Sequence, residues 1–197
     1  MNKLAMKYAI DRFEFLCNCP SDINMHLKTI MTYAKQCQHV TEMGVRGVVS
    51  TWALINALPQ KIVCYDIVEC PIQDASIVSR ELDIDFNFII ADTVDPNLNI
   101  EQTDLLFIDT WHVYDQLKLE LQYHSNKVNK YIILHDTTTF GDAGEMPSTF
   151  YTNHLEKIDG KVGLWPAVEE FLYSNRQWKI KEKFDHNNGL TVLERRT

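Results

Sequence analysis

The sequence predicts an α/β fold in which a mostly parallel sheet closes with a C-terminal antiparallel hairpin. Short apolar segments without polar alternation recur between residues 39 and 137, which is typical of strands covered on both faces. Segments with helical periodicity separate them, as the crossover helices of a parallel sheet would. Residues 178–196 differ, because their side chains alternate with period two on either side of an Asn-Gly turn.

Five apolar segments predict the parallel strands. In chain order they are HVTEMG (39–44), KIVCYDI (61–67), FNFIIAD (86–92), DLLFIDT (104–110) and YIILHDT (131–137). The helices expected between them cover residues 50–58, 73–81 and 114–126. Leu117 and Leu121 give the last helix an apolar stripe.

The two ends of the chain add helices and the hairpin. Apolar residues recur at helical spacing after Ser21, which predicts a helix over 22–37. A second helix is expected at 166–174, with Pro166 suited to the first helical position. The hairpin strands are WKIKEKF (178–184) and LTVLERR (190–196), joined by the turn sequence HNNG.

Length and composition limit the class of protein. A chain of 197 residues is expected to form one domain, 1–197, with an N-terminal helical region at 1–38. The formal charge of −8 argues against nucleic-acid and anionic-membrane partners. No apolar run reaches 18 residues, and charges interrupt the N-terminus too often for a signal peptide. Five cysteines without a C-x-x-C pair predict reduced thiols, so we expect a cytoplasmic protein.

Four of the apolar segments end on an aspartate. These residues are Asp66, Asp92, Asp109 and Asp136. The carboxyl ends of parallel strands meet at one edge of the sheet, where ligands of open α/β folds bind. Each aspartate alone is explained equally well as a helix cap or loop residue. Four at one edge favour a functional site.

The segment TEMGVRGVVST follows the first strand and suggests a nucleoside-containing cofactor. Gly44 and Gly47 would let the backbone turn sharply and approach a ligand closely. The pattern is not G-x-G-x-x-G, because Arg46 and Val48 stand where further glycines would be expected. Asp66 follows roughly 20 residues later, a spacing that suits a carboxylate bonded to the hydroxyls of a ribose.

With these motifs in order, the chain resembles the class I S-adenosylmethionine-dependent methyltransferases. The resemblance rests on EMGVRGVVST, CYDI, IIAD, FIDTWHVYDQ, YIILHDTTTFGD and HNNGLTVLER, and it covers roughly residues 35–197. The branch that it resembles most contains small sugar and antibiotic O-methyltransferases related to cephalosporin hydroxylase and the rhamnosyl O-methyltransferases. It implies a Rossmann-like methyltransferase fold: a mostly parallel seven-stranded sheet, helices on both faces and a C-terminal antiparallel hairpin.

The resemblance also implies a set of cofactor-binding residues. They are Glu42, Gly44, Gly47, Ser50, Asp66, Asp92, Thr93 and Asp109. Glu42 and the two glycines would line the methionine moiety of S-adenosylmethionine. Asp66 would accept hydrogen bonds from the ribose, and Asp92 with Thr93 would lie near the adenine.

A magnesium site is implied at the next two strand ends. Asp109 and Asp136 fall where metal-dependent relatives place acidic ligands, and Thr137 could supply a further oxygen. Adjacent strands lie roughly 4.8 Å apart, so the two carboxylates either share a cation or keep one of them protonated. His112 stands where relatives carry a general base, with a structural role at the helix start equally favoured. Strand alternation predicts that His135 points away from Asp136 and serves as a core or supporting residue.

The function expected is O-methylation of a small hydroxylated acceptor, such as a sugar, by S-adenosylmethionine with magnesium. The glycine-rich segment 141–163 is a candidate lid or substrate loop, or else a surface insertion. One alternative is an NAD(P)-dependent reductase, because Tyr114 and Lys118 form a Y-x-x-x-K match. Another is a non-catalytic nucleotide-binding module. No G-x-S-x-G elbow is present for a hydrolase, and homo-oligomer formation is left open.

Overall fold

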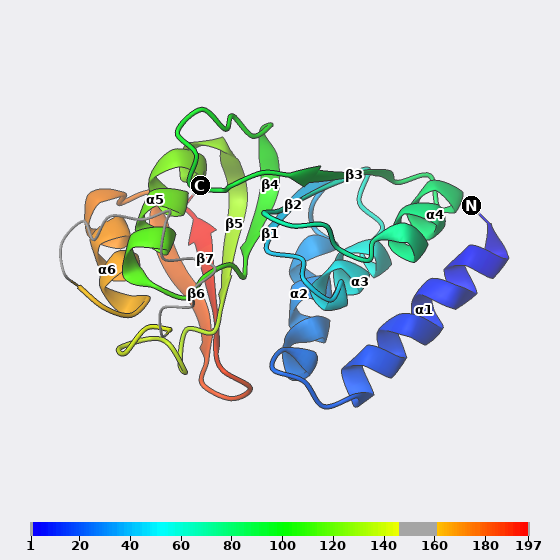
Figure 1. The fold of residues 1–197 in the computed structure, drawn as a ribbon, viewed down its shortest axis with the longest axis horizontal. Coiled ribbons are helices and arrows are strands. Elements are labelled where there is room, and N and C mark those ends of the chain that lie inside the picture. Colours follow the sequence, from blue (N-terminus) through cyan, green and yellow to red (C-terminus); the bar gives the residue numbers. More distant parts are fainter. Residues whose placement is uncertain (1, 146–160, 197) are drawn as a thin grey trace.

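One seven-stranded sheet organises the chain (Figure 1). The computed structural model describes residues 2–145 and 161–196. The strands are β1 (His39–Met43), β2 (Lys61–Asp66), β3 (Asp85–Ile90), β4 (Thr103–Ile108), β5 (Val128–His135), β6 (Trp178–Phe184) and β7 (Leu190–Arg195). Their order in the sheet is β3-β2-β1-β4-β5-β7-β6, and β7 is antiparallel to both of its neighbours. The predicted parallel sheet with a terminal hairpin is confirmed.

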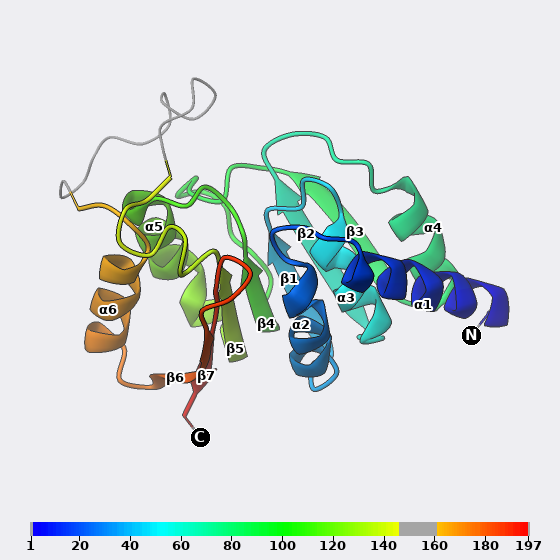
Figure 2. The same cartoon turned by 90° about the horizontal axis from the view of Figure 1, so that it is seen from below.

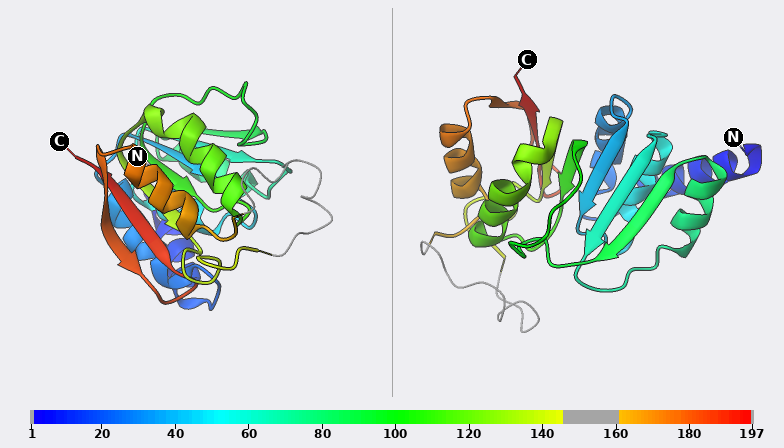
Figure 3. Two further views of the ribbon diagram at one scale, coloured as in Figure 1. Left: turned by 90° about the vertical axis from the view of Figure 1, so that its left-hand side faces the viewer. Right: turned by 90° about the horizontal axis from the view of Figure 1, so that it is seen from above.

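Helices cover both faces of the sheet (Figures 1 and 2). The helical elements are α1 (Lys3–Asn18), η1 (Asn24–His26), α2 (Leu27–Ala34), α3 (Val49–Asn56), α4 (Gln73–Glu81), α5 (Tyr114–His124), η2 (Ser125–Lys127) and α6 (Trp165–Ser174). The apolar faces of α1 to α4 share one buried core with the sheet, and α5 and α6 share a second core on its other face. Figure 3 shows α5 and α6 packed side by side.

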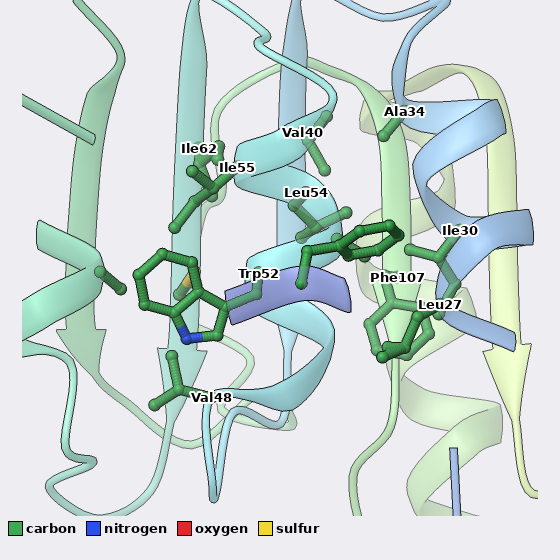
Figure 4. Close-up of a cluster of buried hydrophobic side chains, with 14 of the residues drawn as sticks. Leu27, Ile30, Ala34, Val40, Val48, Trp52, Leu54, Ile55, Ile62 and Phe107 are labelled. Atoms are coloured by element: carbon green, nitrogen blue, oxygen red, sulfur yellow. The ribbon is translucent and has the colours of Figure 1, made fainter. Parts of the chain in front are cut away.

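The first core explains why the strands are apolar without alternation. Val40 of β1 and Phe107 of β4 belong to this core, together with Leu27 of α2 and Leu54 of α3 (Figure 4). The next residues along each strand, such as Leu106, are buried in the core on the opposite face. Because both faces are covered there, most positions of β2 and β4 are apolar, as the sequence predicted, whereas the edge strand β3 leaves Ile89 and Ile90 exposed and departs from that prediction.

The N-terminal residues form two α-helices rather than one. α1 begins after Asn2, whose side chain accepts a hydrogen bond from Leu4 N, and it buries Ala9 and Phe13. The helix predicted over 22–37 begins later, because the Ser21 hydroxyl accepts from Asn24 N and holds a turn before η1. Within the described residues, no helix is long and apolar enough to cross a membrane.

The turn between β6 and β7 supports the edge of the sheet where the site lies. Asn187, Asn188 and Gly189 have left-handed φ values of 47°, 67° and 94°, as an Asn-Gly hairpin turn requires. The Asn188 carbonyl accepts hydrogen bonds from the backbone N–H groups of Thr138 and Thr139. The hairpin therefore fixes the loop that follows β5.

Candidate active site

Two carboxylates and an imidazole meet beyond the ends of β4 and β5. These strands are parallel neighbours, with Ile108 opposite Leu134, so Asp109 and Asp136 emerge at the same edge. One ligand atom from each of Asp109, His112 and Asp136 lies within 4.8 Å of the others. The predicted proximity of the two aspartates is therefore present in the structure, and His112 joins them.

His112 lies between the two aspartates and a third carboxylate. Its Nε2 is 3.1 Å from Asp109 Oδ1 and 2.9 Å from Asp136 Oδ2, and its Nδ1 is 3.0 Å from Glu145 Oε2. The Phe140 ring stacks on the imidazole with an interplanar angle of 3°. Burial alone would favour the neutral ring, but the hydrogen bonds to the three carboxylates raise the pKa of His112 to about 11.

Glu145 is a site residue that the sequence did not reveal. Its Oε2 also accepts from the backbone N–H of His112, and its own N–H donates to the His112 carbonyl. Glu145 lies in a glycine-rich loop without helical or strand periodicity, so no pattern marked it.

Strand alternation predicts that His135 points away from Asp136, and this prediction is wrong. His135 Nδ1 lies 3.3 Å from Asp109 Oδ1 and 3.4 Å from Asp136 Oδ2. Asp136 takes a left-handed φ of 59°, which ends the alternation one residue after the strand and turns its carboxylate toward His135. Burial opposes protonation of His135, but the Asp109 charge raises its pKa to about 10.

The two imidazoles keep both aspartates ionised. Burial would raise the pKa of Asp109, but the charge of His135 and the hydrogen bond to His112 lower it to about 2. The pKa of Asp136 is also lowered, because hydrogen bonds to His112 and His135 outweigh burial. A protonated aspartic acid, one of the two expected solutions, is therefore not needed in this arrangement.

The donor chemistry of this cluster fits a divalent cation. Asp109 and Asp136 supply anionic oxygens and His112 supplies a nitrogen within one small volume. Among the described residues, Asp136 Oδ1 is buried without a hydrogen-bond partner. Such an orphaned carboxylate oxygen is costly unless something binds it.

The loop after β1 packs directly against this cluster. Gly44 has a φ of 86°, and a Cβ there would clash with the backbone carbonyl of Asp109. The other left-handed residues of the loop are Arg46 and Val48, with φ values of 41° and 64°. Gly47 is not left-handed, and within the described part of the chain a Cβ there would meet only Val49, at 3.8 Å, an ordinary contact. Two of the left-handed positions in this loop are therefore occupied by Arg46 and Val48, which favour that conformation less than glycine does.

Glu42 and Ser50 lie beneath this loop. The Glu42 side chain is fully buried and accepts hydrogen bonds from Ser50 (2.5 Å), Thr51 (2.7 Å) and Cys64 (3.1 Å). Burial raises the pKa of Glu42 to about 7, although these hydrogen bonds oppose the shift. The carboxylate joins β1, β2 and the first turn of α3, and its contact with a cofactor stays a prediction.

Asp66 holds the other side of the same loop. Its Oδ2 accepts from the backbone N–H groups of Val45 (2.9 Å) and Arg46 (3.0 Å), and its Oδ1 accepts from Val68 (3.2 Å). Burial would raise the pKa of Asp66, but these backbone donors lower it. The Arg46 guanidinium reaches back to Asp22 at 2.7 Å.

Asp92 and Thr93 follow β3 and differ in exposure. Asp92 is half-buried and its Oδ1 accepts from Val94 N at 3.0 Å. Thr93 is buried, and its hydroxyl donates to Glu120 at 2.6 Å. Glu120 also accepts from Thr110, the residue after Asp109, at 2.9 Å.

Glu120 is the second residue that sequence reasoning missed. It lies on α5 three positions after Leu117, hence on the buried face of that helix. That position was a usable signal, because a charged residue on an apolar helix face is rarely buried without a role. Burial raises the pKa of Glu120 to about 7, against hydrogen bonds from Thr93, Gln116 and Thr110.

Two further predictions fall beside the cluster. The Thr137 hydroxyl is buried and accepts from Thr191 Oγ1 at 2.9 Å, so its role as a metal ligand stays a prediction. Most of the predicted lid, residues 146–160, lies outside the described residues.

The residues behind the reductase alternative have structural contacts. Lys118 Nζ donates to the Tyr114 hydroxyl at 2.8 Å, and that hydroxyl donates to Glu170 of α6 at 2.7 Å. The network joins α5 to α6. The antiparallel β7 also departs from the all-parallel sheet of dinucleotide-binding folds.

One of two cavities lies beside the cluster, and the larger one lies elsewhere. A small cavity beside the cluster is lined by Thr110, Trp111, His112, Glu120 and His135 among others. A larger, open groove of about 430 Å³ lies between α2 and strands β5 and β6. It is lined by residues such as Thr29 and Glu182, away from the strand-end carboxylates, so we place the site at the cluster.

Compared by sequence, the chain matches no protein-family model and no curated protein. Compared by structure, it is similar to an O-methyltransferase from Bacillus cereus in complex with SAH, at 13% identity and a TM-score of 0.59, covering 100% of this chain and 92% of that one. It is also similar to the O-methyltransferase TomG from Streptomyces achromogenes in complex with SAM, at 15% identity and a TM-score of 0.60, covering 100% and 92%. A third match is the SAH-bound methyltransferase PaMTH1 from Podospora anserina, at 13% identity and a TM-score of 0.59, covering 96% and 88%. This chain therefore has the fold of the class I S-adenosylmethionine-dependent methyltransferases.

Proposed function

We propose that this protein is an S-adenosylmethionine-dependent O-methyltransferase that acts on a small hydroxylated acceptor with the help of a divalent cation. The observation that carries the proposal is the convergence of Asp109, His112 and Asp136 beside the Gly44 loop, at the ligand-binding edge of this fold. The similar proteins named above were solved with SAM or SAH. We extend that ligand to this chain.

The loop after β1 and the end of β2 would hold the cofactor. Asp66 accepts three backbone hydrogen bonds and also interacts with the Cys70 thiol, a weak donor that a ribose hydroxyl would displace. The backbone at Gly47 is open to close approach, because among the described residues only Val49 stands near the position of the missing Cβ. Asp92, which is half-buried just after β3, would lie near the adenine.

The acceptor hydroxyl would bind at the cluster, where its proton must be removed. A divalent cation held by Asp109 and Asp136 would lower the pKa of that hydroxyl. His112 is the predicted base, and Glu145 would hold the Nδ1 proton so that Nε2 faces the two aspartates. The methyl group would pass from the sulfonium of S-adenosylmethionine to the acceptor oxygen, leaving SAH, and the hydroxyl proton would leave to a base. One nitrogen lone pair cannot accept that proton and bind a metal at once, so His112 has two competing roles.

Magnesium and a sugar are the cation and acceptor that the sequence resemblance favours. The carboxylates suit magnesium, whereas the imidazole does not distinguish it from other dications. A sugar hydroxyl fits the chemistry of the proposal as any small alcohol or phenol would.

Calorimetric titration with S-adenosylmethionine and with SAH tests the cofactor. We expect both to bind with 1:1 stoichiometry, and Asp66→Ala to weaken binding while the fold is retained. Binding of neither compound would refute the proposal, and binding of NADPH instead would favour the reductase.

A second experiment tests transfer itself. The protein, S-adenosylmethionine and a panel of small catechols, alcohols and sugars are incubated with a divalent cation, and SAH is measured. We expect an acceptor-dependent rise that Asp109→Asn abolishes. Cofactor binding without SAH formation for any acceptor would favour the non-catalytic nucleotide-binding module.

A further inference from the structure

We propose that the cation site takes a first-row transition-metal ion such as Co²⁺ or Zn²⁺ in preference to Mg²⁺, with His112 Nε2 as a ligand beside Asp109 and Asp136. The inference rests on the metal part of the proposed function and replaces its magnesium. It also chooses between the two roles of His112.

The first argument is the direction of the imidazole. His112 Nε2 lies 2.9 Å from Asp136 Oδ2 and 3.1 Å from Asp109 Oδ1, so it points between the two carboxylates. A nitrogen in that position can replace its proton by a metal ion held by the same two oxygens. A base for the acceptor would instead need its lone pair directed away from the metal ligands and toward the substrate.

The second argument is the support on the far side of the ring. Histidines that bind metals almost always donate their other ring N–H to a carboxylate, a carbonyl or water, which fixes the tautomer. Glu145 Oε2 takes this position at 3.0 Å from His112 Nδ1, and it also accepts from the His112 backbone N–H. Phe140 stacks on the ring and limits its rotation.

The third argument is independent of His112. Asp136 is 3% exposed, and among the described residues its Oδ1 is a buried atom without a hydrogen-bond partner. The Oδ2 of the same carboxylate faces the cluster. A metal ion that the carboxylate binds through both oxygens would give Oδ1 a partner and compensate this otherwise costly burial.

Ligand preference then selects the metal. Mg²⁺ prefers oxygen ligands in near-ideal octahedral geometry and keeps several waters, whereas imidazole suits zinc, iron, copper and nickel. A second imidazole strengthens the nitrogen character of the site, because His135 Nδ1 lies 3.3 and 3.4 Å from the same two carboxylate oxygens. Two imidazoles beside two carboxylates are a poor match for Mg²⁺.

The test measures metal binding alone, without cofactor or acceptor. Chelator-treated protein is titrated with Co²⁺, Zn²⁺ and Mg²⁺ by calorimetry. We expect Co²⁺ and Zn²⁺ to bind at least about tenfold more tightly than Mg²⁺. Equal affinities, tighter binding of Mg²⁺ or no binding of any ion would each overturn the proposal. The proposed methyltransferase function fails separately, if neither S-adenosylmethionine nor SAH binds.

Variants and spectroscopy identify the ligand. H112Q should remove the preference for Co²⁺ over Mg²⁺, whereas D109N should weaken both ions. The control is H39Q, at the amino end of β1 and far along the strand from the cluster, which should bind as the wild type does. E145Q should weaken Co²⁺ binding by about 10- to 100-fold. An unchanged metal preference in H112Q would contradict the assignment.

One measurement uses the wild-type protein and therefore does not depend on whether any variant folds. Electron spin-echo envelope modulation of the wild type loaded with Mn²⁺ should show a directly bound ¹⁴N nucleus. Oxygen ligands alone would give no such signal, and its absence would exclude His112 from the metal.

Discussion

The backbone of Gly44 packs against the backbone carbonyl of Asp109, so closely that any Cβ at Gly44 would clash with it. Two further hydrogen bonds fix this contact: Asp109 N donates to Met43 O at 2.8 Å, and Gly44 N donates to Tyr65 O at 2.9 Å. The loop expected to hold the cofactor and the first acidic residue of the cluster are therefore one rigid unit. A change in either position moves the other.

Gly44→Ala should destabilise the protein, because the new methyl group meets backbone rather than a flexible side chain and the φ of 86° is strained for alanine. We expect a loss of roughly 1–3 kcal/mol in the free energy of unfolding, measured by urea denaturation. Gly47→Ala is the matched control, because its Cβ would make an ordinary contact with Val49 at 3.8 Å. Equal stability of the two variants would contradict this account of the loop.

Asp66→Asn should loosen the same loop from its other side. The carboxylate accepts from Val45, Arg46 and Val68, and an amide oxygen can keep only part of these bonds. We expect a loss of about 1–3 kcal/mol of stability, because backbone donors are left without a charged acceptor. If Asp66 also binds the ribose, the SAH affinity of Asp66→Asn should fall further than that of the Asp22→Asn control. The control removes the ion pair with the Arg46 side chain and leaves Asp66 intact. Isothermal calorimetry on the two folded variants separates these effects.

Topology made the strand-end residues predictable. Apolar runs located β1 to β5, and each run's last residues had to reach the same sheet edge, so Asp109 and Asp136 could be paired before any coordinates. The hairpin was predictable because Asn188 and Gly189 accept the left-handed turn that joins β6 and β7. The spacing of apolar residues carried this information.

Other features of the site depend on local backbone conformation and tertiary contacts, which the apolar pattern does not encode. His135 was assigned the wrong side because alternation was extended past the strand, whereas Asp136 is left-handed. Arg46 and Val48 are left-handed too, although their side chains give no sign of it. Glu145 reaches His112 from a loop without any period, so only tertiary contacts reveal it.

The charge states of His26, His112 and His135 should differ within the same pH range. Hydrogen bonds to carboxylates raise the pKa of His112 to about 11, and the Asp109 charge raises that of His135 to about 10. Burial lowers the pKa of His26 to about 4, and the positive charge of His135, whose ring centroid lies 5.7 Å away, lowers it further. In metal-free protein between pH 5 and 8, we expect imidazolium ¹³C shifts for the first two and neutral shifts for His26. Titration of His112 within this range would contradict the raised pKa that its carboxylate partners give it.

His112 and His135 should make the free energy of unfolding depend on pH, because their pKa values are raised in the folded state. A raised pKa in the folded state means that the stabilisation is complete below the unfolded pKa of about 6.5 and is lost as pH rises through 10 and 11. H135Q should therefore lose less stability than the wild type between pH 8 and 11. Thermal unfolding at a series of pH values measures the difference, and parallel curves would oppose it.

Glu120 should act in the same direction but at lower pH. Burial raises its pKa from 4.5 to about 7, so the folded protein binds more protons than the unfolded chain between these values. Stability contributed by Glu120 is then present below pH 4.5 and falls as pH rises toward 7. Glu120→Gln removes this titration while keeping the shape of the side chain. We expect the variant's free energy of unfolding, measured in urea, to depend less steeply on pH between 4.5 and 7 than that of the wild type.

Glu42→Gln is an informative comparison, because burial raises the pKa of Glu42 to about 7 as well, away from α5. The double variant should flatten the dependence further, since the two carboxylates share no hydrogen-bond partner in the described structure. A slope unchanged in Glu120→Gln would mean that the carboxylate stays ionised over this range, stabilised by Thr93 and Thr110 more strongly than its burial opposes.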